Sequence, residues 1–202
     1  LARQHKIKYI LAGTNHVTEG VPMPSNWNWF KYDARNIKSI VSQNSKTQIK
    51  SMPTIGVSKW VYSTYVLGIQ WIDFLDYIEF SKQEALNELI DKFDYKPYPY
   101  KHYESVFTRL YQGYILPEKF GIDKRKVHLS ADVLAGEMTR AEAKSTLLEI
   151  PYVNEKQLNH DIEYFLKKMK WTTSELDSYI SRPRKEHDIY RSEKAVYNLL
   201  LN

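Results

Sequence analysis

The run IKYILAG, residues 7–13, decides the fold that this sequence predicts. A short apolar run that ends in glycine is typical of a buried parallel strand leading into a functional loop. Residues 1–6 resemble the last turn of a helix, and one other buried strand is expected around residues 49–55. Because a parallel strand needs partners, we expect the chain to hold only part of an α/β sheet and to lack the part that its first strand would join.

The composition predicts a folded protein with a sizeable core. The chain has 202 residues, of which 43% are hydrophobic and 14% aromatic, and it fits one domain or a domain with a small helical appendage. It has no cysteine, which excludes disulfides and thiolate metal sites, and its histidines are too scattered to suggest a zinc site. Because it has neither an apolar run of about 18 residues nor a signal-peptide pattern, we expect no membrane span and a cytoplasmic location.

Helices are predicted to dominate from residue 81 onward. The expected N-terminal caps of four helices are Ser81, Thr139, Asn154 and Thr172. The apolar residues of 85–93 and of 158–169 recur at helical spacing, so we expect both stripes to pack in the core. Residues 57–78 are rich in aromatic side chains that either pack a helix pair or line a groove, and we favour helix there.

Charge is distributed unevenly along the chain. Residues 96–128 carry seven Lys or Arg against three Asp or Glu, a net +4, with five Tyr interleaved. Residues 71–94 carry two basic against seven acidic side chains, a net −5. Such blocks are typical of solvated faces, and they also suit binding to anionic ligands or to nucleic acid, so three interpretations stay open.

The first candidate site follows the opening strand. Ligands of open α/β sheets bind beyond the carboxyl ends of the strands, where Gly13, Thr14, Asn15 and Glu19 would lie. Their oxygens would make a partial Mg²⁺ shell, with Glu19 as the carboxylate ligand. The competing interpretation is an ordinary turn with side-chain-to-backbone hydrogen bonds.

The second candidate site begins at Lys101 and His102 and continues into an expected helix over residues 104–115. At about 100° per residue, one sector of that helix is polar and the opposite one apolar. The polar sector consists of Glu104, Ser105, Thr108, Arg109 and Gln112. Hydroxyl, amide, guanidinium and carboxylate groups together suit a polar anionic ligand better than they suit a plain solvated face.

The third candidate site is the start of another expected helix. Asp123 is a good N-cap, which places Lys124 and Arg125 in the first turn, where cations oppose the helix dipole. A bound anion would make that basic pair favourable, and a solvated basic turn is the alternative. The sequence contains no Gly-x-Ser-x-Gly, His-Glu-x-x-His, Walker-type or dinucleotide glycine motif.

Several of these motifs together resemble the N-acetyl sugar amidotransferase family. They are YPYKHYESVFTR (98–109), YQGYILP (111–117), FGIDKR (120–125), the opening 12–20 and LDYIE (75–79). The resemblance implies a PP-loop ATP pyrophosphatase of the adenine-nucleotide α-hydrolase type. It implies that residues 1–80 are the C-terminal part of that α/β domain, a parallel-sheet remnant, and that residues 81–202 are a mostly helical substrate-binding region.

The same resemblance implies an activity in the synthesis of surface polysaccharide, such as the O-antigen of lipopolysaccharide. The family is expected to convert an acetamido group of a UDP-linked sugar into an acetamidino group. ATP and Mg²⁺ would adenylate the amide oxygen and release pyrophosphate. Ammonia would come from glutaminase and ammonia-channel subunits resembling the histidine-biosynthesis pair.

Binding roles follow from the resemblance residue by residue. Gly13, Thr14, Asn15 and Glu19 would meet ATP and Mg²⁺. The residues expected to bind substrate or phosphate are Lys101, His102, Glu104, Thr108, Arg109, Lys124, Arg125 and His128. The family's Ser-Gly-Gly-x-Asp-Ser loop and cysteine-rich segment are absent from these residues, so we expect this chain alone to be inactive. Residues 133–137 read VLAGE where relatives tend to carry Cys-Ser-Gly-Gln.

Two rival functions come from the residues themselves. Basic stretches with interleaved Tyr also suit a module that binds or modifies nucleic acid such as tRNA, which we consider the weaker interpretation, and a purely helical interaction module is the third. Exposed apolar edges of a short sheet would favour a homodimer. The amidotransferase interpretation requires the second candidate site to face the same cleft as the turn after the first strand.

Overall fold

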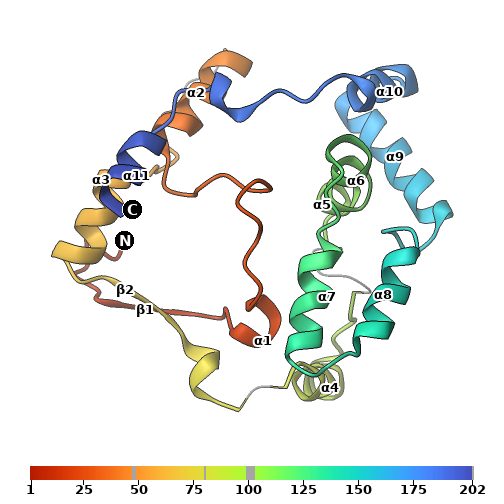
Figure 1. The fold of residues 1–202 in the computed structure, drawn as a ribbon, viewed down its shortest axis with the longest axis horizontal. Helices are drawn as coiled ribbons and strands as arrows, with labels where there is room; N and C mark the ends of the chain where they lie inside the picture. Colours follow the sequence, from red (N-terminus) through yellow and green to blue (C-terminus); the bar gives the residue numbers. More distant parts are fainter. Residues whose placement is uncertain (47–48, 80, 99–102, 202) are drawn as a thin grey trace. The chain divides into compact units, whose positions relative to one another are not determined.

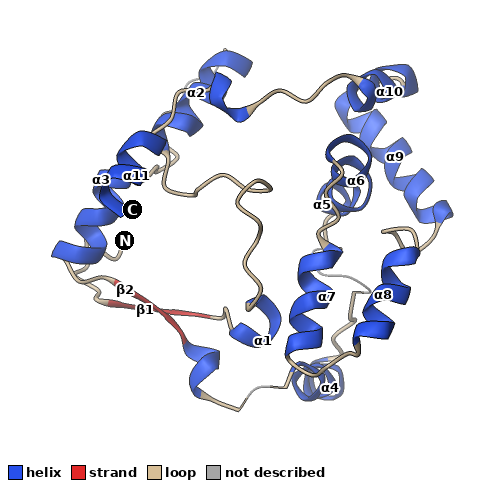
Figure 2. Cartoon of the chain, viewed as in Figure 1, coloured by secondary structure: helices blue, strands red, loops and turns tan. Residues whose placement is uncertain are grey.

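A computed structural model describes residues 1–46, 49–79, 81–98 and 103–201. The chain forms two compact units that interleave in sequence. Unit 1 comprises residues 1–12, 28–73 and 185–202, and unit 2 comprises residues 13–27 and 74–184. Helices dominate both units, and the two strands of the described residues lie in unit 1 (Figures 1 and 2). No helix in the described part of the chain is both long and apolar enough to cross a bilayer.

The sheet of unit 1 has two parallel strands, β1 (Tyr9–Ala12) and β2 (Gln70–Asp73), with Tyr9 opposite Gln70 and Ala12 opposite Asp73. The prediction of a parallel strand at residues 7–13 is confirmed, but the second strand expected at 49–55 is wrong. Residues 49–56 form a loop. The apolar side chains of that stretch gave a strand-like pattern, whereas the backbone partner of β1 comes after Gly68, whose φ of +65° ends the preceding helix.

β1 is not buried, contrary to the prediction. With a single partner strand, Tyr9 and Leu11 are 59% and 66% exposed, and Trp71 on β2 is 67% exposed. Both faces of the sheet therefore present apolar side chains to solvent.

The remaining elements of unit 1 are helical. They are α2 (Ala34–Asn44), α3 (Val57–Val61), the π-helical turn η1 (Tyr62–Val66), the short 3-10 helix η4 (His187–Ile189) and α11 (Lys194–Leu201). The preference for helix over residues 57–78 is thus confirmed for the first ten of them and wrong for β2.

Asp33 joins the segments of unit 1. Its buried carboxylate accepts hydrogen bonds from the Asn36 amide at 2.9 Å, which caps α2, from the Trp29 indole at 3.1 Å and from the Glu193 amide at 3.1 Å. Glu193 in turn accepts from the Val57 amide at 2.7 Å and caps α3. The chain near residue 193 is therefore fixed to two helices that lie far from it in sequence.

His187 makes the stability of unit 1 depend on pH. Its ring stacks on Trp29 with centroids 4.0 Å apart and donates from Nε2 to Asn36 Oδ1 at 2.9 Å. Burial lowers the pKa of His187 below its ordinary value of 6.5, against the opposing pull of Asp33 and Asp188. Because the unfolded chain then binds the proton more readily, the stabilisation is complete above pH 6.5 and is lost as the pH falls through the lowered pKa.

We therefore expect the urea concentration at the unfolding midpoint of unit 1 to decrease as the pH is lowered from 7.5 to 5.5. His187→Gln should reduce that pH dependence while keeping an amide donor near Asn36. His5→Gln is the matched control because His5 is an exposed histidine of the same unit. An equal pH dependence in the wild type and in His187→Gln would contradict the assignment to His187.

Unit 2 is helical throughout its described residues. Its elements are α1 (His16–Glu19), the 3-10 helix η2 (Phe74–Tyr77), α4 (Lys82–Phe93), α5 (Val106–Leu110), the π-helical turn η3 (Tyr111–Ile115), α6 (Leu116–Phe120), α7 (Arg125–Leu134), α8 (Arg140–Leu148), α9 (Glu155–Met169) and α10 (Thr173–Ser181).

All four predicted N-caps are confirmed. Ser81, Thr139, Asn154 and Thr172 each accept a hydrogen bond from the backbone amide three residues later, and the threonines complete full capping boxes. Most of the predicted α9 stripe is core: Phe165 packs with Leu110 and Leu176, and these three side chains are buried. Leu158, Ile162 and Leu166 pack against them, whereas Met169 is 47% exposed. The α4 stripe is not core, because no residue of α4 is buried and Phe93 is 72% exposed.

Residues 106–120 form one continuous helical stretch with a π-helical turn at Gly113. The backbone there approaches the 151–152 turn so closely that a Cβ on Gly113 would overlap the carbonyl oxygen of Pro151 and lie 2.8 Å from the ring of Tyr152. Glycine is therefore required by a close approach of two segments.

Gly113→Ala is expected to lower the free energy of unfolding by about 1–3 kcal/mol, the usual cost of overpacking. Urea denaturation followed by circular dichroism measures it. Gly13→Ala is the control, since a Cβ at Gly13 meets nothing within 4 Å. Equal effects of the two substitutions would contradict the close approach of Gly113 to Pro151.

Candidate binding pocket

Unit 2 contains a pocket of about 810 Å³ between α4, α7, α8 and the start of α5. One part of its wall is apolar and aromatic, with Leu86, Leu89, Tyr95, Tyr98 and Met138. The other part is polar, with Lys82, Glu104, Gln112, Asp123, Lys124, Arg125, His128 and Asp132. A volume of this size and a mostly apolar wall with convergent polar groups are typical of a small-molecule site.

Four predicted site residues line this pocket: Glu104, Lys124, Arg125 and His128. Gln112, from the predicted polar sector, lines it as well. Glu104 lies just before the helix, because Ser105 is the N-cap of α5 and accepts from the Thr108 amide. The second and third candidate sites therefore meet in one cavity. Lys101 and His102 lie outside the described residues.

Arg125 is held rigidly at the edge of the pocket. Its guanidinium pairs with Asp123 at 2.8 Å and also donates to the carbonyl oxygens of Thr146 and Glu149, each at 3.1 Å. Asp123 also accepts from the Arg125 amide at 2.9 Å, but the N-cap of α7 is Lys124, so the prediction of Asp123 as the N-cap is wrong by one residue. Arg125 thus fastens the first turn of α7 to the last turn of α8, where a cation is favourable.

α4 covers another side of the pocket. Lys82 at its start pairs with Asp132 on α7 at 3.0 Å, and its Leu86 and Leu89 line the cavity. The sequence interpretation assigned this apolar stripe to the core and so missed the residues that line the pocket. The net −5 of residues 71–94 was the available signal, because a strongly acidic segment rarely supplies a core helix.

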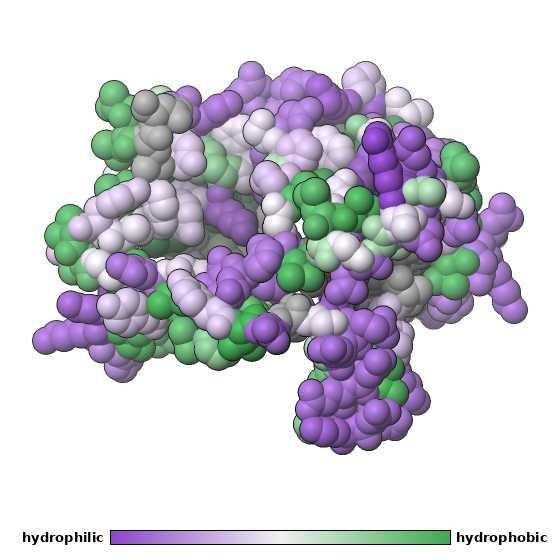
Figure 3. All heavy atoms as spheres, turned by 60° about the horizontal axis from the view of Figure 1, so that its bottom comes forward, coloured by the Kyte–Doolittle hydropathy of each residue, from purple (hydrophilic) through white to green (hydrophobic). Residues whose placement is uncertain are grey.

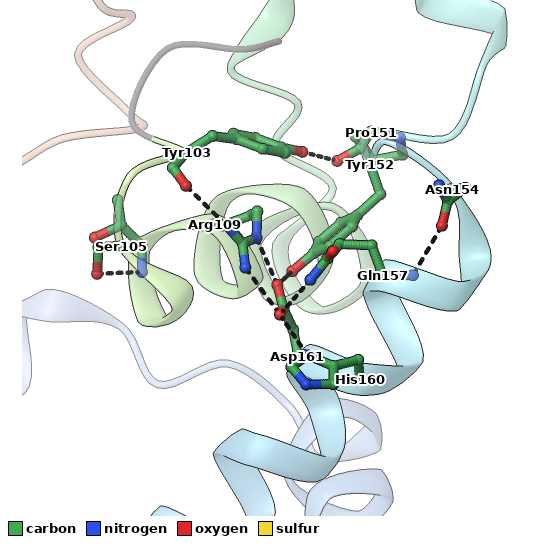
Figure 4. Close-up of polar contacts among 10 residues, drawn as sticks. Tyr103, Ser105, Arg109, Pro151, Tyr152, Asn154, Gln157, His160 and Asp161 are labelled. Carbon is green, nitrogen blue, oxygen red and sulfur yellow. Dashed lines mark hydrogen bonds and ion pairs between the residues drawn. The ribbon is translucent and has the colours of Figure 1, made fainter. Parts of the chain in front are cut away.

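Thr108 and Arg109 do not line the pocket. The guanidinium of Arg109 forms a bidentate ion pair with Asp161 at 2.5 and 2.9 Å and donates to the Tyr103 carbonyl oxygen at 2.8 Å (Figure 4). Asp161 is fully buried and also accepts from Tyr152 at 2.6 Å and from Gln157 at 2.9 Å.

The protonation states of this cluster are fixed by its geometry. Burial opposes ionisation of Asp161, but hydrogen bonds from Arg109, Tyr152 and Gln157 outweigh it and lower its pKa to about 2. Burial and the hydrogen bond to Asp161 raise the pKa of Tyr152. The pair therefore stays ionised and Tyr152 stays a donor throughout the physiological range of pH.

The loop after β1 lies elsewhere on α7. α1 packs against α7 (Figure 1), and Asp76 Oδ1 accepts from both the amide and Nδ1 of His16, each at 2.8 Å. The pKa of Asp76 is lowered, mainly by the backbone hydrogen bond from His16 and further by the hydrogen bond from the His16 side chain. This contact joins two of the segments that carry the family resemblance, 12–20 and 75–79.

Gly13, Thr14, Asn15 and Glu19 do not line the 810 Å³ pocket, so the cleft that they would share with the second candidate site is not this pocket. Glu19 is the last residue of α1, which contacts α7, the helix that carries Arg125 and His128. Among the described residues no group of three or more His, Cys, Asp or Glu side chains could hold a metal ion.

The surface of the chain carries many large apolar side chains. Figure 3 shows hydrophobic groups interspersed among hydrophilic ones over the face in view, without a separation into one polar and one apolar side. The +4 of residues 96–128 is partly neutralised in the folded chain, because Arg109 is paired with Asp161, which lies outside that stretch.

Comparison with known proteins identifies about half of the chain. Residues 104–201 match the family described as "LPS biosynthesis protein WbpG-like, C-terminal domain". No curated protein matches. No solved structure matches either. The matched range includes α5 to α11 and all four predicted residues that line the pocket, of which Glu104 is the first residue of the range.

Proposed function

Because residues 104–201 belong to the WbpG-like C-terminal domain family of LPS biosynthesis proteins, we propose that the pocket of unit 2 binds the nucleotide-linked N-acetyl sugar of an ATP-dependent amidotransferase. The chemistry is the conversion of an acetamido into an acetamidino group. The proposal includes the division of the chain at residue 80 into the end of a PP-loop domain and a helical substrate-binding region.

The observation that carries the proposal is the convergence of Glu104, Gln112, Lys124, Arg125 and His128 on one cavity of about 810 Å³. They come from three elements, and the family match and the motif resemblance both cover them. The volume lies within the usual range for small-molecule sites, which is roughly 300–1,000 Å³.

The residues of the pocket suit a ligand with both polar and flat apolar parts. Glu104 and Gln112 are hydrogen-bonding partners for sugar hydroxyl and acetamido groups, and Lys124 supplies a positive charge for a phosphate oxygen. Tyr95 and Tyr98 offer ring faces for stacking against a base or a sugar. Arg125, held by four oxygen partners, would orient the ligand without rearranging.

ATP, when bound, would turn the amide oxygen into a good leaving group for attack by ammonia. We propose Gly13, Thr14, Asn15 and Glu19 as the contribution of this chain to that site, with Glu19 as a Mg²⁺ ligand. Ammonia would be delivered by glutaminase and ammonia-channel subunits, and a homodimer is part of the same proposal.

Titration calorimetry with UDP-N-acetylglucosamine tests the pocket. We expect Lys124→Met to weaken binding about tenfold, since a hydrogen bond to a charged group contributes roughly 1.5–3 kcal/mol. Lys126→Met is the matched control, because Lys126 is an exposed lysine two residues away that does not line the pocket. Equal loss in both variants, or no binding by the wild type, would sink the proposal.

A competition experiment with polyuridylate distinguishes nucleotide-sugar binding from nucleic-acid binding. Polyuridylate binding that outcompetes the nucleotide sugar and falls steeply with salt would favour nucleic-acid binding instead. Under the amidotransferase proposal, polyuridylate leaves nucleotide-sugar binding unchanged.

A further inference from the structure

The buried cluster Arg109–Asp161–Tyr152 is connected to two residues that line the pocket, Tyr103 and Pro151 (Figure 4). None of its three members lines the cavity, but Arg109 and Tyr152 are each directly linked to a residue that does, and Asp161 holds both of them. Arg109 donates to the main-chain oxygen of Tyr103, and Tyr152 follows Pro151 in the chain. Tyr103 and Pro151 both line the pocket.

One further hydrogen bond joins the two residues of the pocket wall, Tyr103 and Pro151, to each other. The Tyr103 hydroxyl donates to the Pro151 carbonyl oxygen at 2.7 Å, so Tyr103 is held at its backbone by Arg109 and at its ring tip by Pro151. Tyr103 is 5% exposed, and the next residue, Glu104, is exposed and lines the pocket. The same carbonyl oxygen faces Gly113, whose missing side chain allows the close approach.

We propose that Asp161 is a positioning residue for the pocket, which it sets through Arg109 and Tyr152 by fixing Tyr103, Glu104 and Pro151. The inference rests on the proposed function of that pocket. A buried ion pair contributes little net stability compared with apolar packing, because desolvation offsets the attraction. Its bidentate geometry does fix the relative placement of α5, the 151–152 turn and α9.

The physical consequence concerns ligand affinity. Residues that hold the ligand-binding groups in place affect affinity, because even a small shift of those groups changes the distance and angle of their hydrogen bonds to the ligand and weakens them steeply. Removing the hydroxyl of Tyr152 loosens the turn that carries Pro151 without touching the cavity itself. Affinity should therefore fall even though no contact with the ligand is removed.

The test uses the complete chain and two substitutions that each remove one hydroxyl. With UDP-N-acetylglucosamine as the probe, Tyr152→Phe is expected to raise the Kd about tenfold, the lower end of the range found for residues that orient binding groups. Tyr103→Phe should have a similar effect. The double substitution should raise the Kd by less than the product of the two single effects, because both act on the same segment.

A destabilised control separates positioning from stability. Ile180→Ala on α10 removes packing from the Leu110–Phe165–Leu176 core and lies away from the pocket. At a temperature where every variant is folded, Ile180→Ala should keep the wild-type Kd despite a lowered Tm. If Tyr152→Phe lowers the Tm but leaves the Kd unchanged, Asp161 and its partners are structural only and the inference is overturned.

A measurement without ligand keeps the two proposals distinguishable. Amide hydrogen exchange should accelerate at residues 104–107 in Tyr152→Phe and stay at the wild-type rate there in Ile180→Ala. If the wild type binds no nucleotide sugar but this exchange pattern holds, the proposed function fails while the positioning of the wall stands. Unchanged exchange at residues 104–107 in Tyr152→Phe overturns the positioning inference whatever the pocket binds.

Discussion

Asp161→Ala is expected to lower the free energy of unfolding of unit 2 by about 3–5 kcal/mol, the usual result of removing one partner of a buried ion pair. The substitution leaves the Arg109 guanidinium, which is 15% exposed, without its counter-charge, and leaves the Tyr152 hydroxyl without its acceptor. Urea denaturation followed by circular dichroism measures the loss, and ligand affinity should vanish with it.

The matched control is Glu88→Ala, which removes a carboxylate paired with Lys92 on the exposed face of α4. Exposed pairs of this kind contribute little, so the control should unfold like the wild type. A fall in stability no larger than that of Glu88→Ala would contradict the structural importance of Asp161.

The wild type should also lose stability in acid through this group. The pKa of Asp161 is about 2 in the folded chain against an ordinary 3.8. A lowered carboxyl pKa stabilises above pH 3.8, and the stabilisation is lost as the pH falls from 3.8 through 2. In Asp161→Ala that part of the acid sensitivity should be missing.

Asp33→Ala is expected to have the second-largest effect, a loss of about 2–4 kcal/mol that combines a missing N-cap with buried donors left unsatisfied. Asp33 is 2% exposed and receives hydrogen bonds from Trp29, Asn36 and Glu193. The fluorescence of Trp29, whose indole donates to Asp33, should shift as residues 185–202 detach.

Asp33→Asn keeps an acceptor for the α2 cap but turns a donor toward one of the other two groups, so it should cost less than alanine. Asp91→Ala, at an exposed position of α4, controls for loss of a carboxylate. Retention of the wild-type urea midpoint in Asp33→Ala would show that the hydrogen bonds of Asp33 do not hold residues 185–202 in place.

The sequence predicted what depends on local patterns. The caps at Ser81, Thr139, Asn154 and Thr172 are set by residues three positions apart, and all four are confirmed. The resemblance to N-acetyl sugar amidotransferases is confirmed over residues 104–201.

Arg109 shows that local patterns do not predict contacts between residues far apart in the sequence. On a helical wheel it shares a polar sector with Gln112, and the sector was assigned to a ligand. Gln112 does line the pocket, whereas Arg109 turns to Asp161, which is 52 residues away in sequence. No local pattern encodes that pairing, and Gln157 and Asp161 at i and i+4 on α9 were its only trace.

The strand and stripe errors have the same origin. The pairing of β1 with β2 joins residues about sixty positions apart. The local sequence therefore could not distinguish the apolar run near 49–55 from residues 70–73 as the partner strand of β1. The α4 stripe has the spacing of a core helix, but whether such a stripe packs or borders a cavity depends on what faces it.

The interleaving of the two units has a practical consequence for dissecting this protein. Residues 185–202 return to unit 1, so the family-matched range 104–201 ends inside a unit that it does not otherwise build. Expressing residues 104–201 alone would leave Glu193 without Asp33 and α11 without Phe30, the ring on which its Tyr197 stacks. A single protease cut between residues 74 and 184 would likewise not release either unit, since both ends of the chain still belong to the other one.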